Sequence, residues 1–189
     1  MSHTVHFHES PILIVGAGPA GLILALQLAR HGTPCMLVER SVETTRWPKM
    51  DITNCRSMEI FRKLGIADEY RAQGVGQEWP FDVLFSTGLS QGGRALAKWN
   101  LPSPNVYRDI IRANNDGTMP REPRNPFVSS RFGFRFETLV ERDTGIESAL
   151  ADTGTGDRHI VKSAYVVGCD DASSRVRETV GINLLGRPS

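Results

Sequence analysis

The sequence is poor in cysteine and has no excess of charge of either sign. Its three cysteines, Cys35, Cys55 and Cys169, lie far apart and form no C-x-x-C pair. They therefore predict neither a disulfide framework nor a zinc site, and we interpret them as reduced, mostly buried thiols of an intracellular protein. Among the 189 residues, 22 basic and 21 acidic side chains give a formal net charge of +1. This balance argues against a nucleic-acid partner, because a nucleic-acid-binding surface needs a basic excess.

A long hydrophobic run is also missing. The most apolar stretch, 12–28, is interrupted by three glycines and one proline and has no basic segment before it. It predicts neither a membrane span nor a signal peptide, so we expect a soluble, cytoplasmic protein with no membrane partner. The histidines His3, His6 and His8 lack acidic or cysteine partners at ligand spacing. We expect a mobile polar tail there and no metal site.

The most informative feature that is present is the stretch 12–21, ILIVGAGPAG, which has three glycines at G-x-G-x-x-G spacing. In such a turn Gly16 allows a tight bend, Gly18 lets the backbone approach a pyrophosphate, and Gly21 lets helix and strand pack closely. The free N–H groups and the dipole of the following helix attract anions. The predicted cofactor-binding residues of this turn are Gly16, Gly18, Pro19, Ala20 and Gly21.

The segments around the glycines predict a βαβ unit. An apolar strand at 12–15 precedes the turn, and apolar residues at helical spacing follow it up to Gly32. A second apolar strand at 35–38 runs into Glu39. A carboxylate at this position can accept both ribose hydroxyls of an adenosine. The alternatives are a glycine-bearing turn that binds nothing and, for Glu39, a surface acid at the end of a strand.

The rest of the chain changes period several times. We expect helices at 55–64, capped by Asn54, and at 67–73, followed by a strand pair between 81 and 99. Three further strands, at 132–141, 146–151 and 158–167, are separated by turn residues and predict an antiparallel meander. The last strand leads through Gly168-Cys169-Asp170-Asp171 to a helix at 173–180 and so repeats the geometry of the opening turn.

Three segments, 16–41, 48–74 and 131–182, resemble the class A flavin-dependent monooxygenases, the aromatic-ring hydroxylases related to phenol and para-hydroxybenzoate hydroxylase. The first is shared with many dinucleotide enzymes. The third, a meander running into GCD-x-ASS-x-VR, is far more particular to these hydroxylases. The resemblance implies FAD as cofactor and NAD(P)H as co-substrate.

The resemblance also implies an α/β fold, with a Rossmann-like FAD-binding domain of the glutathione-reductase type and an inserted antiparallel β-meander. We expect the FAD-binding domain at 1–78 and 155–189. A partial substrate-domain sheet is expected at 79–154, with a long irregular loop at 100–130. The family has an amphipathic helix before the meander and a Gly-Asp signature after the second helix, and neither is found in this sequence. We therefore expect an architecture that is incomplete relative to the family, as in a truncated hydroxylase.

Further cofactor-binding residues are implied by the resemblance alone. Asp171 stands where the family has glycine, and its side chain and charge would crowd the backbone and repel a phosphate of a nicotinamide nucleotide. The alternatives are a helix cap with an ion pair for Asp170 and Arg177, and solvated surface charges for Lys49 and Arg56. The residues implied are Glu39 and Arg40 at the adenosine, Lys49 and Arg56 near the pyrophosphate and ribityl chain, and Asp170, Ser174 and Arg177 in the second signature.

The function that the resemblance implies is hydroxylation of a phenolic or polyketide-like small molecule by an FAD-dependent monooxygenase that uses NAD(P)H and O2. Secondary metabolism and aromatic degradation are the two expected settings. Because the cofactor carries the chemistry, no Ser, His or Cys nucleophile is required, and no catalytic residue is assigned. Two alternatives stay open. One is a truncated, non-catalytic flavoprotein fragment, and the other is an NAD-dependent dehydrogenase, which the meander disfavours.

Overall fold

The computed structural model describes residues 4–44, 52–76, 78–80, 82–88, 90, 92–101, 103, 113–114 and 126–186. Contacts within the chain define two compact units, 1–44 together with 119–189, and 45–118. This division differs from the boundaries expected from the sequence, which stay a prediction about the domains of the family. The difference arises because the strands of the meander pack against the βαβ unit, as described below.

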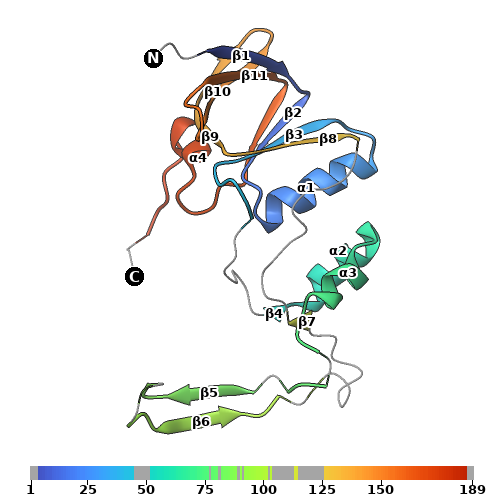
Figure 1. The fold of residues 1–189 in the computed structure, drawn as a ribbon, viewed down its shortest axis with the longest axis vertical. Coiled ribbons are helices and arrows are strands. Elements are labelled where there is room, and N and C mark those ends of the chain that lie inside the picture. Colours follow the sequence, from blue (N-terminus) through green and yellow to red (C-terminus); the bar gives the residue numbers. More distant parts are fainter. Residues whose placement is uncertain are drawn as a thin grey trace. The chain divides into compact units, whose positions relative to one another are not determined.

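A four-stranded parallel sheet forms the centre of the first unit, and helix α1 packs on one of its faces (Figure 1). The side chains of α1 contact Ile14 and Leu37 of the two central strands, and Leu22 and Ala25 of the helix are buried there. The predicted βαβ unit is therefore confirmed. In spatial order the strands are β12 (Tyr165–Gly168), β2 (Ile12–Val15), β3 (Cys35–Glu39) and β8 (Val128–Phe132), and α1 spans Pro19–Arg30.

A mixed sheet covers the other face of the parallel sheet. Its strands are, in spatial order, β1 (Val5–Glu9), β11 (Arg158–Ser163), β10 (Gly145–Asp152) and β9 (Phe134–Arg142). Leu13, Met36 and Val38 of the parallel sheet pack against Leu150 and Val161 of the mixed sheet. Strands β2 and β3 are thus buried on both faces, which explains their unbroken apolar sequences. The meander of β9, β10 and β11 is confirmed as antiparallel.

One expectation for this region was wrong. The segment predicted as one strand at 158–167 is two strands, because the chain leaves the mixed sheet after Ser163 and joins the parallel sheet at Tyr165. The strand expected at 132–141 is confirmed as β9, while Phe132 is the last residue of β8 in the parallel sheet. A continuous run of strand-forming residues does not reveal a change of sheet, because tertiary contacts decide which strands pair.

The N-terminal segment is a strand and not the mobile tail that we expected. Val5–Glu9 pairs in parallel with β11 along its whole length, from Val5 opposite Arg158 to Glu9 opposite Lys162. The same register continues in the parallel sheet, where Ile12 lies opposite Tyr165. The two chain segments β1–β2 and β11–β12 therefore pass side by side from one sheet to the other.

Among its described residues, the second unit has two helices and two small antiparallel strand pairs. Asn54 caps α2 by accepting a hydrogen bond from the Ser57 amide at 2.9 Å, as predicted. The Tyr70 hydroxyl lies 2.6 Å from that of Thr53. The elements are β4 (Ile52–Thr53), α2 (Cys55–Leu64), α3 (Ala67–Ala72), β5 (Val83–Ser86), β6 (Ala95–Trp99) and β7 (Ala113–Asn114), with β4 paired to β7 and β5 to β6.

The remaining helix, α4 (Arg175–Thr179), follows β12 and buries Val176 in the core between the two sheets. It is shorter than the helix expected at 173–180. The loop expected at 100–130 also differs, because 113–114 form β7 and β8 begins at Val128. Within the described ranges, none of the helices has the length and apolar character needed to cross a membrane.

Candidate functional site

Two strand-to-helix turns lie next to each other at the carboxyl edge of the parallel sheet. The first follows β2 and leads through Gly16 and Gly18 into α1, and the second follows β12 and leads through Asp170 into α4. The Gly16 amide donates to the Val38 carbonyl at 2.8 Å, and the Cys169 amide donates to the Val15 carbonyl at 2.7 Å. This edge is where ligands bind in open parallel α/β sheets.

The first turn is closed tightly by two glycines. Gly16 has φ of +105°, and a Cβ placed on it would lie 2.4 Å from the Cys169 carbonyl oxygen. A Cβ on Gly21 would lie 1.9 Å from the carbonyl oxygen of Gly16. No side chain fits at either position, so the backbone of the first turn packs directly on helix α1 and on the second turn.

Gly18, in contrast, faces open space. It is the N-cap residue of α1, with extended backbone angles, and a Cβ on it would meet no atom within 4 Å. The N-terminus of α1 has no side-chain cap and no acidic residue in its first turn. Pro19 has no amide hydrogen, so the amides of Ala20 and Gly21 are the uncapped donors of this 12-residue helix. The turn therefore leaves two amide N–H groups free to bind an anion, and no side chain at Gly18 blocks the approach to them.

Glu39 lies at the end of β3, beside this turn. Its Oε2 accepts a hydrogen bond from the Ala17 amide at 2.9 Å, and its Oε1 accepts one from the Ser41 amide at 2.9 Å. These two bonds fix the carboxylate next to the glycine turn. A carboxylate has about four acceptor positions, so each oxygen can still accept a hydroxyl. The arrangement fits the ribose-binding role predicted for Glu39.

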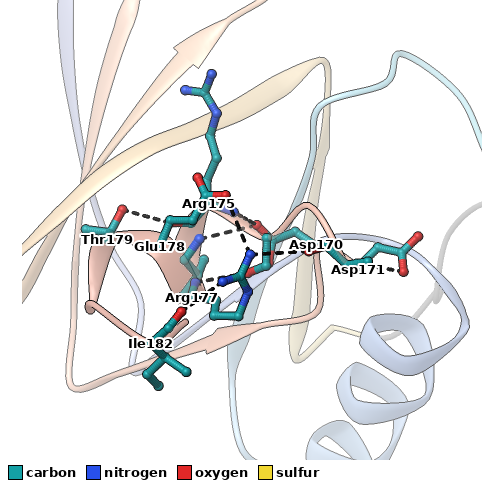
Figure 2. Close-up of polar contacts among 10 residues, drawn as sticks. Asp170, Asp171, Arg175, Arg177, Glu178, Thr179 and Ile182 are labelled. Atoms are coloured by element: carbon teal, nitrogen blue, oxygen red, sulfur yellow. Dashed lines mark hydrogen bonds and ion pairs between the residues drawn. The ribbon is translucent and has the colours of Figure 1, made fainter. Parts of the chain in front are cut away.

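The second turn is capped by its own side chains (Figure 2). Asp170 Oδ2 accepts hydrogen bonds from the amides of Arg175 at 2.8 Å and Val176 at 3.3 Å. Its Oδ1 accepts one from the Ser174 hydroxyl, whose oxygen in turn accepts from the Arg177 amide at 3.0 Å. The first three amides of α4 are thus bonded to side chains of the same turn, which is the helix-cap alternative for Asp170 and Ser174.

The Arg177 side chain, which is 20% exposed, bonds to the backbone on both sides of α4. Its guanidinium donates to the carbonyl oxygens of Ile182 at 2.8 Å and Ala172 at 3.3 Å (Figure 2). Its ion-pair partner is Glu178, at 3.5 Å, and not Asp170. Arg177 therefore connects the residues before and after α4, and a role in cofactor binding stays a prediction.

Asp171 has an unusual backbone. Its φ is +69°, the only positive φ of a non-glycine residue in the described part of the chain. The Asp171 carboxylate accepts a hydrogen bond from the next amide, Ala172, at 2.8 Å. It points away from the contacts that cap α4 (Figure 2). Glycine would adopt this conformation without strain.

Three more residues are predicted at the cofactor. Arg40 directly follows Glu39 at this edge and is exposed. Arg56 belongs to the second unit, where its guanidinium lies 2.8 Å from the Glu59 carboxylate on the surface of α2. Lys49 lies outside the described residues. The cofactor-binding roles of these three residues stay predictions.

Sequence reasoning missed the part that Cys169 plays at this edge. Its backbone carbonyl lies against Gly16 and its Cβ lies near Gly21. The signal was its place directly after the strand that ends in Gly168. Burial raises the pKa of the Cys169 thiol, and the neighbouring Asp170 charge raises it further, so the thiol stays protonated at neutral pH. Among the residues that the structure describes, no group of His, Cys, Asp or Glu has the arrangement of a metal site.

Comparison with protein families identifies the kind of domain. Residues 9–188 match the family described as "FAD binding domain". The chain is 41% identical over 203 residues to the FAD-dependent monooxygenase apdD of Emericella nidulans, covering 98% of this chain and 32% of that protein. It is 29% identical over 190 residues to 2,4-dichlorophenol 6-monooxygenase of Delftia acidovorans, covering 95% of this chain and 32% of that protein.

Among solved structures, the fold is similar to that of the flavin-dependent monooxygenase PieE in complex with FAD and substrate. The TM-score is 0.77 at 32% identity, over 95% of this chain and 33% of PieE. The chain thus spans about a third of the length of the relatives that it matches.

Proposed function

The chain belongs to the FAD binding domain family of the flavin-dependent aromatic hydroxylases, and we propose that it binds the ADP part of FAD at the carboxyl edge of its parallel sheet. The observation that carries this proposal is the uncapped N-terminus of α1 with the Glu39 carboxylate fixed beside it. Two uncapped amides and the helix dipole suit a pyrophosphate. An acceptor at the end of the next strand suits the adenosine ribose.

The residues of the first turn fit this cofactor in size as well as in charge. Gly16 and Gly21 bring the backbone close to the strand edge, and Gly18 leaves the approach to the amides open. Glu39 would hold the ribose hydroxyls, while its bond to the Ala17 amide keeps it in place. FAD, when bound, supplies the redox chemistry that couples NAD(P)H and O2 to hydroxylation of an aromatic ring. The described residues contribute binding and orientation.

For the whole protein that contains this domain, we propose FAD-dependent hydroxylation of a phenolic or polyketide-like small molecule with NAD(P)H as co-substrate. The named activities of the relatives, a chlorophenol monooxygenase and FAD-dependent monooxygenases, support this class of reaction. Family membership argues against the NAD-dependent dehydrogenase alternative. The truncated-fragment alternative differs in outcome, because it predicts FAD binding without phenol-stimulated NAD(P)H oxidation by the purified chain.

The binding proposal is tested by changing Gly18, where there is room for a side chain. Gly18→Asp places a carboxylate at the N-cap of α1, where it would bond the free amides and repel a phosphate. We expect Gly18→Asp to weaken FAD binding at least about tenfold, since that factor corresponds to 1.4 kcal/mol, while the helix becomes no less stable. Titration of the purified chain with FAD, followed by flavin fluorescence, measures the affinity.

Two further proteins control this experiment. Gly18→Ala adds a methyl group without charge where the pyrophosphate would approach, so it should weaken FAD binding less than Gly18→Asp does. Thermal denaturation of all three proteins separates loss of binding from loss of folding. Equal FAD affinity of Gly18→Asp and the unchanged chain would contradict the site, and absence of binding by the unchanged chain would contradict the proposed function.

A further inference from the structure

Three imidazole rings from two neighbouring strands form a stack in the mixed sheet. His6 and His8 lie two residues apart on β1, and His6 is directly opposite His159 on β11. The ring centroids of His6 and His159 are 4.7 Å apart with an interplanar angle of 18°, and those of His8 and His159 are 5.2 Å apart with an angle of 16°. These three residues are called the imidazole stack below.

The stack is joined by a hydrogen bond that depends on protonation. His8 Nε2 and His159 Nδ1 are 2.9 Å apart. One of these nitrogens must donate and the other accept, which requires at least one of the two rings to be neutral. If both rings were protonated, two N–H groups and two positive charges would face each other at this distance. The contact is therefore compatible with neutral pH and opposed by acid.

The surroundings favour the neutral form. His159 is 8% exposed and the edge of the Phe134 ring packs on it, with centroids 4.6 Å apart. Burial lowers the pKa of His159, and the neighbouring His6 and His8 lower it further, whereas Asp152 and Asp157 act in the opposite direction. Burial also lowers the pKa of His8, followed by the charges of Arg131 and His6.

The remaining charged groups around the stack come from several elements. Arg131 belongs to β8 of the parallel sheet, Asp152 ends β10, and Asp157 lies in the turn before β11. The Asp157 carboxylate lies 3.7 Å from His6 Nε2 and also accepts a hydrogen bond from the Thr4 amide at 3.0 Å. Asp157 thus attracts a protonated His6, but no ion pair joins it to His8 or His159, which form a part-buried pair.

Besides its backbone ladder, β1 has few contacts with its neighbour other than the stack. Within the residues that the structure describes, it is an edge strand paired with β11. On its other face Val5 and Phe7 are 49% and 77% exposed. Apart from its backbone ladder, β1 therefore depends on the face that carries His6 and His8. We propose that protonation of the imidazole stack releases β1 from β11 at mildly acidic pH while the parallel sheet stays folded.

The direction of the pH effect depends on which state of β1, docked or released, binds protons more readily. When β1 is released, His8 returns to its ordinary pKa of about 6.5, and His159 loses the burial and the two neighbouring imidazoles that β1 supplies, so the released state binds protons more readily than the docked state. Docking is favoured fully above pH 6.5 and weakens as the pH falls below that value. Each unit by which the docked pKa lies below the released one changes the docking equilibrium by up to about tenfold.

Amide hydrogen exchange of the purified chain at pH 7.5 and pH 5.5, corrected for the intrinsic exchange rate, measures the docking of β1. We expect the protection of the β1 amides that face β11 to fall severalfold in acid, because the released state takes up protons more readily than the docked state. The amides of β2 and β3 should keep their protection. Equal protection of β1 at both pH values would overturn the proposal.

Variants of the stack complete the test. His159→Phe keeps an aromatic ring against Phe134 but cannot be protonated, so the pH dependence of docking should become smaller, with only the contribution of His8 left. If β1 is unprotected at both pH values in His159→Phe, the deciding variant is His8→Gln, which removes one titrating ring of the bonded pair. In His8→Gln, β1 should be docked at pH 7.5, and its protection should fall less in acid than in the unchanged chain. His31→Gln is the control, because this exposed histidine at the end of α1 lies outside the stack. A pH dependence retained in full by the deciding variant would overturn the proposal.

Discussion

The two strand-to-helix turns at the edge of the parallel sheet have similar places in the fold but differ in whether side chains bond the helix amides. Each has a strand ending near a glycine, followed by a helix, and the two turns are in direct contact. In the first turn the helix amides are left without a side-chain cap, whereas in the second Asp170 and Ser174 bond the amides of α4. A glycine at the end of a strand is therefore not sufficient to define an anion site. The side chains that follow it decide whether the helix N-terminus is open or already satisfied.

The largest loss of stability is expected when a side chain is added in the closed part of the first turn. In Gly21→Ala the new methyl group would lie 1.9 Å from the Gly16 carbonyl oxygen. Because the neighbouring atoms are backbone and cannot rotate away, we expect a loss of about 3 kcal/mol or more in the free energy of unfolding, or failure to fold. Urea denaturation measures it, with Gly18→Ala as the control in open space. A loss below about 1 kcal/mol in Gly21→Ala would contradict the tight packing, since surface substitutions give changes of that size.

The second turn is broken by removing its cap. Asp170→Ala leaves the amides of Arg175 and Val176 and the Ser174 hydroxyl without their acceptor. We expect a loss of about 2 kcal/mol in the free energy of unfolding, typical of a lost helix cap with unsatisfied donors. Hydrogen exchange should show the loss of protection at α4 first.

Ser174→Ala is the graded control for the same turn. It removes the acceptor for the Arg177 amide and the hydroxyl that donates to Asp170 Oδ1, but it leaves Asp170 bonded to the amides of Arg175 and Val176. Its effect should therefore be about half as large, near 1 kcal/mol. If Asp170→Ala left the stability unchanged while weakening FAD binding, Asp170 would be a ligand-binding residue and not a structural cap.

The smallest change in stability is expected at Asp171, in the second turn. Its φ of +69° disfavours any side chain, so Asp171→Gly should raise the free energy of unfolding by about 1 kcal/mol. Asp171→Asn tests the alternative cause, because it removes the charge and keeps the side chain. Equal gains from both variants would show that charge repulsion, and not the backbone, destabilises this residue. Thermal denaturation at low and high salt distinguishes the two causes, since salt screens only the charge.

Sequence reasoning succeeded where the determinants are local. The glycine turn, the Asn54 cap of α2 and the hairpin of β5 and β6 depend on residues within a few positions of each other. It also gathered Gly16, Gly18, Gly21 and Glu39 at one edge, because parallel strands joined by a helix always bring their carboxyl ends together. These are the parts of the candidate site that the first unit contains.

It failed where partners are distant in the sequence. Nothing near Val5–Glu9 reveals that this segment pairs with β11, more than a hundred residues later. The change of sheet between Ser163 and Tyr165 is likewise not evident, because strand-forming residues continue through it and the partners of each strand are distant in the sequence. The role of Asp170 depends on whether its carboxylate turns back to α4, which spacing alone does not determine.

The paired passage of β1–β2 and β11–β12 from one sheet to the other restricts how this sequence can change in evolution. Both sheets share one register along these segments, with Val5 opposite Arg158 and Ile12 opposite Tyr165. A single inserted or deleted residue at Ser10 or Ala164 would turn every side chain of one strand to the opposite face. It would also displace Gly16 from Cys169 at the far end. Length variation should therefore be found in the turns at 142–145 and 153–157 and be excluded from these two short crossings.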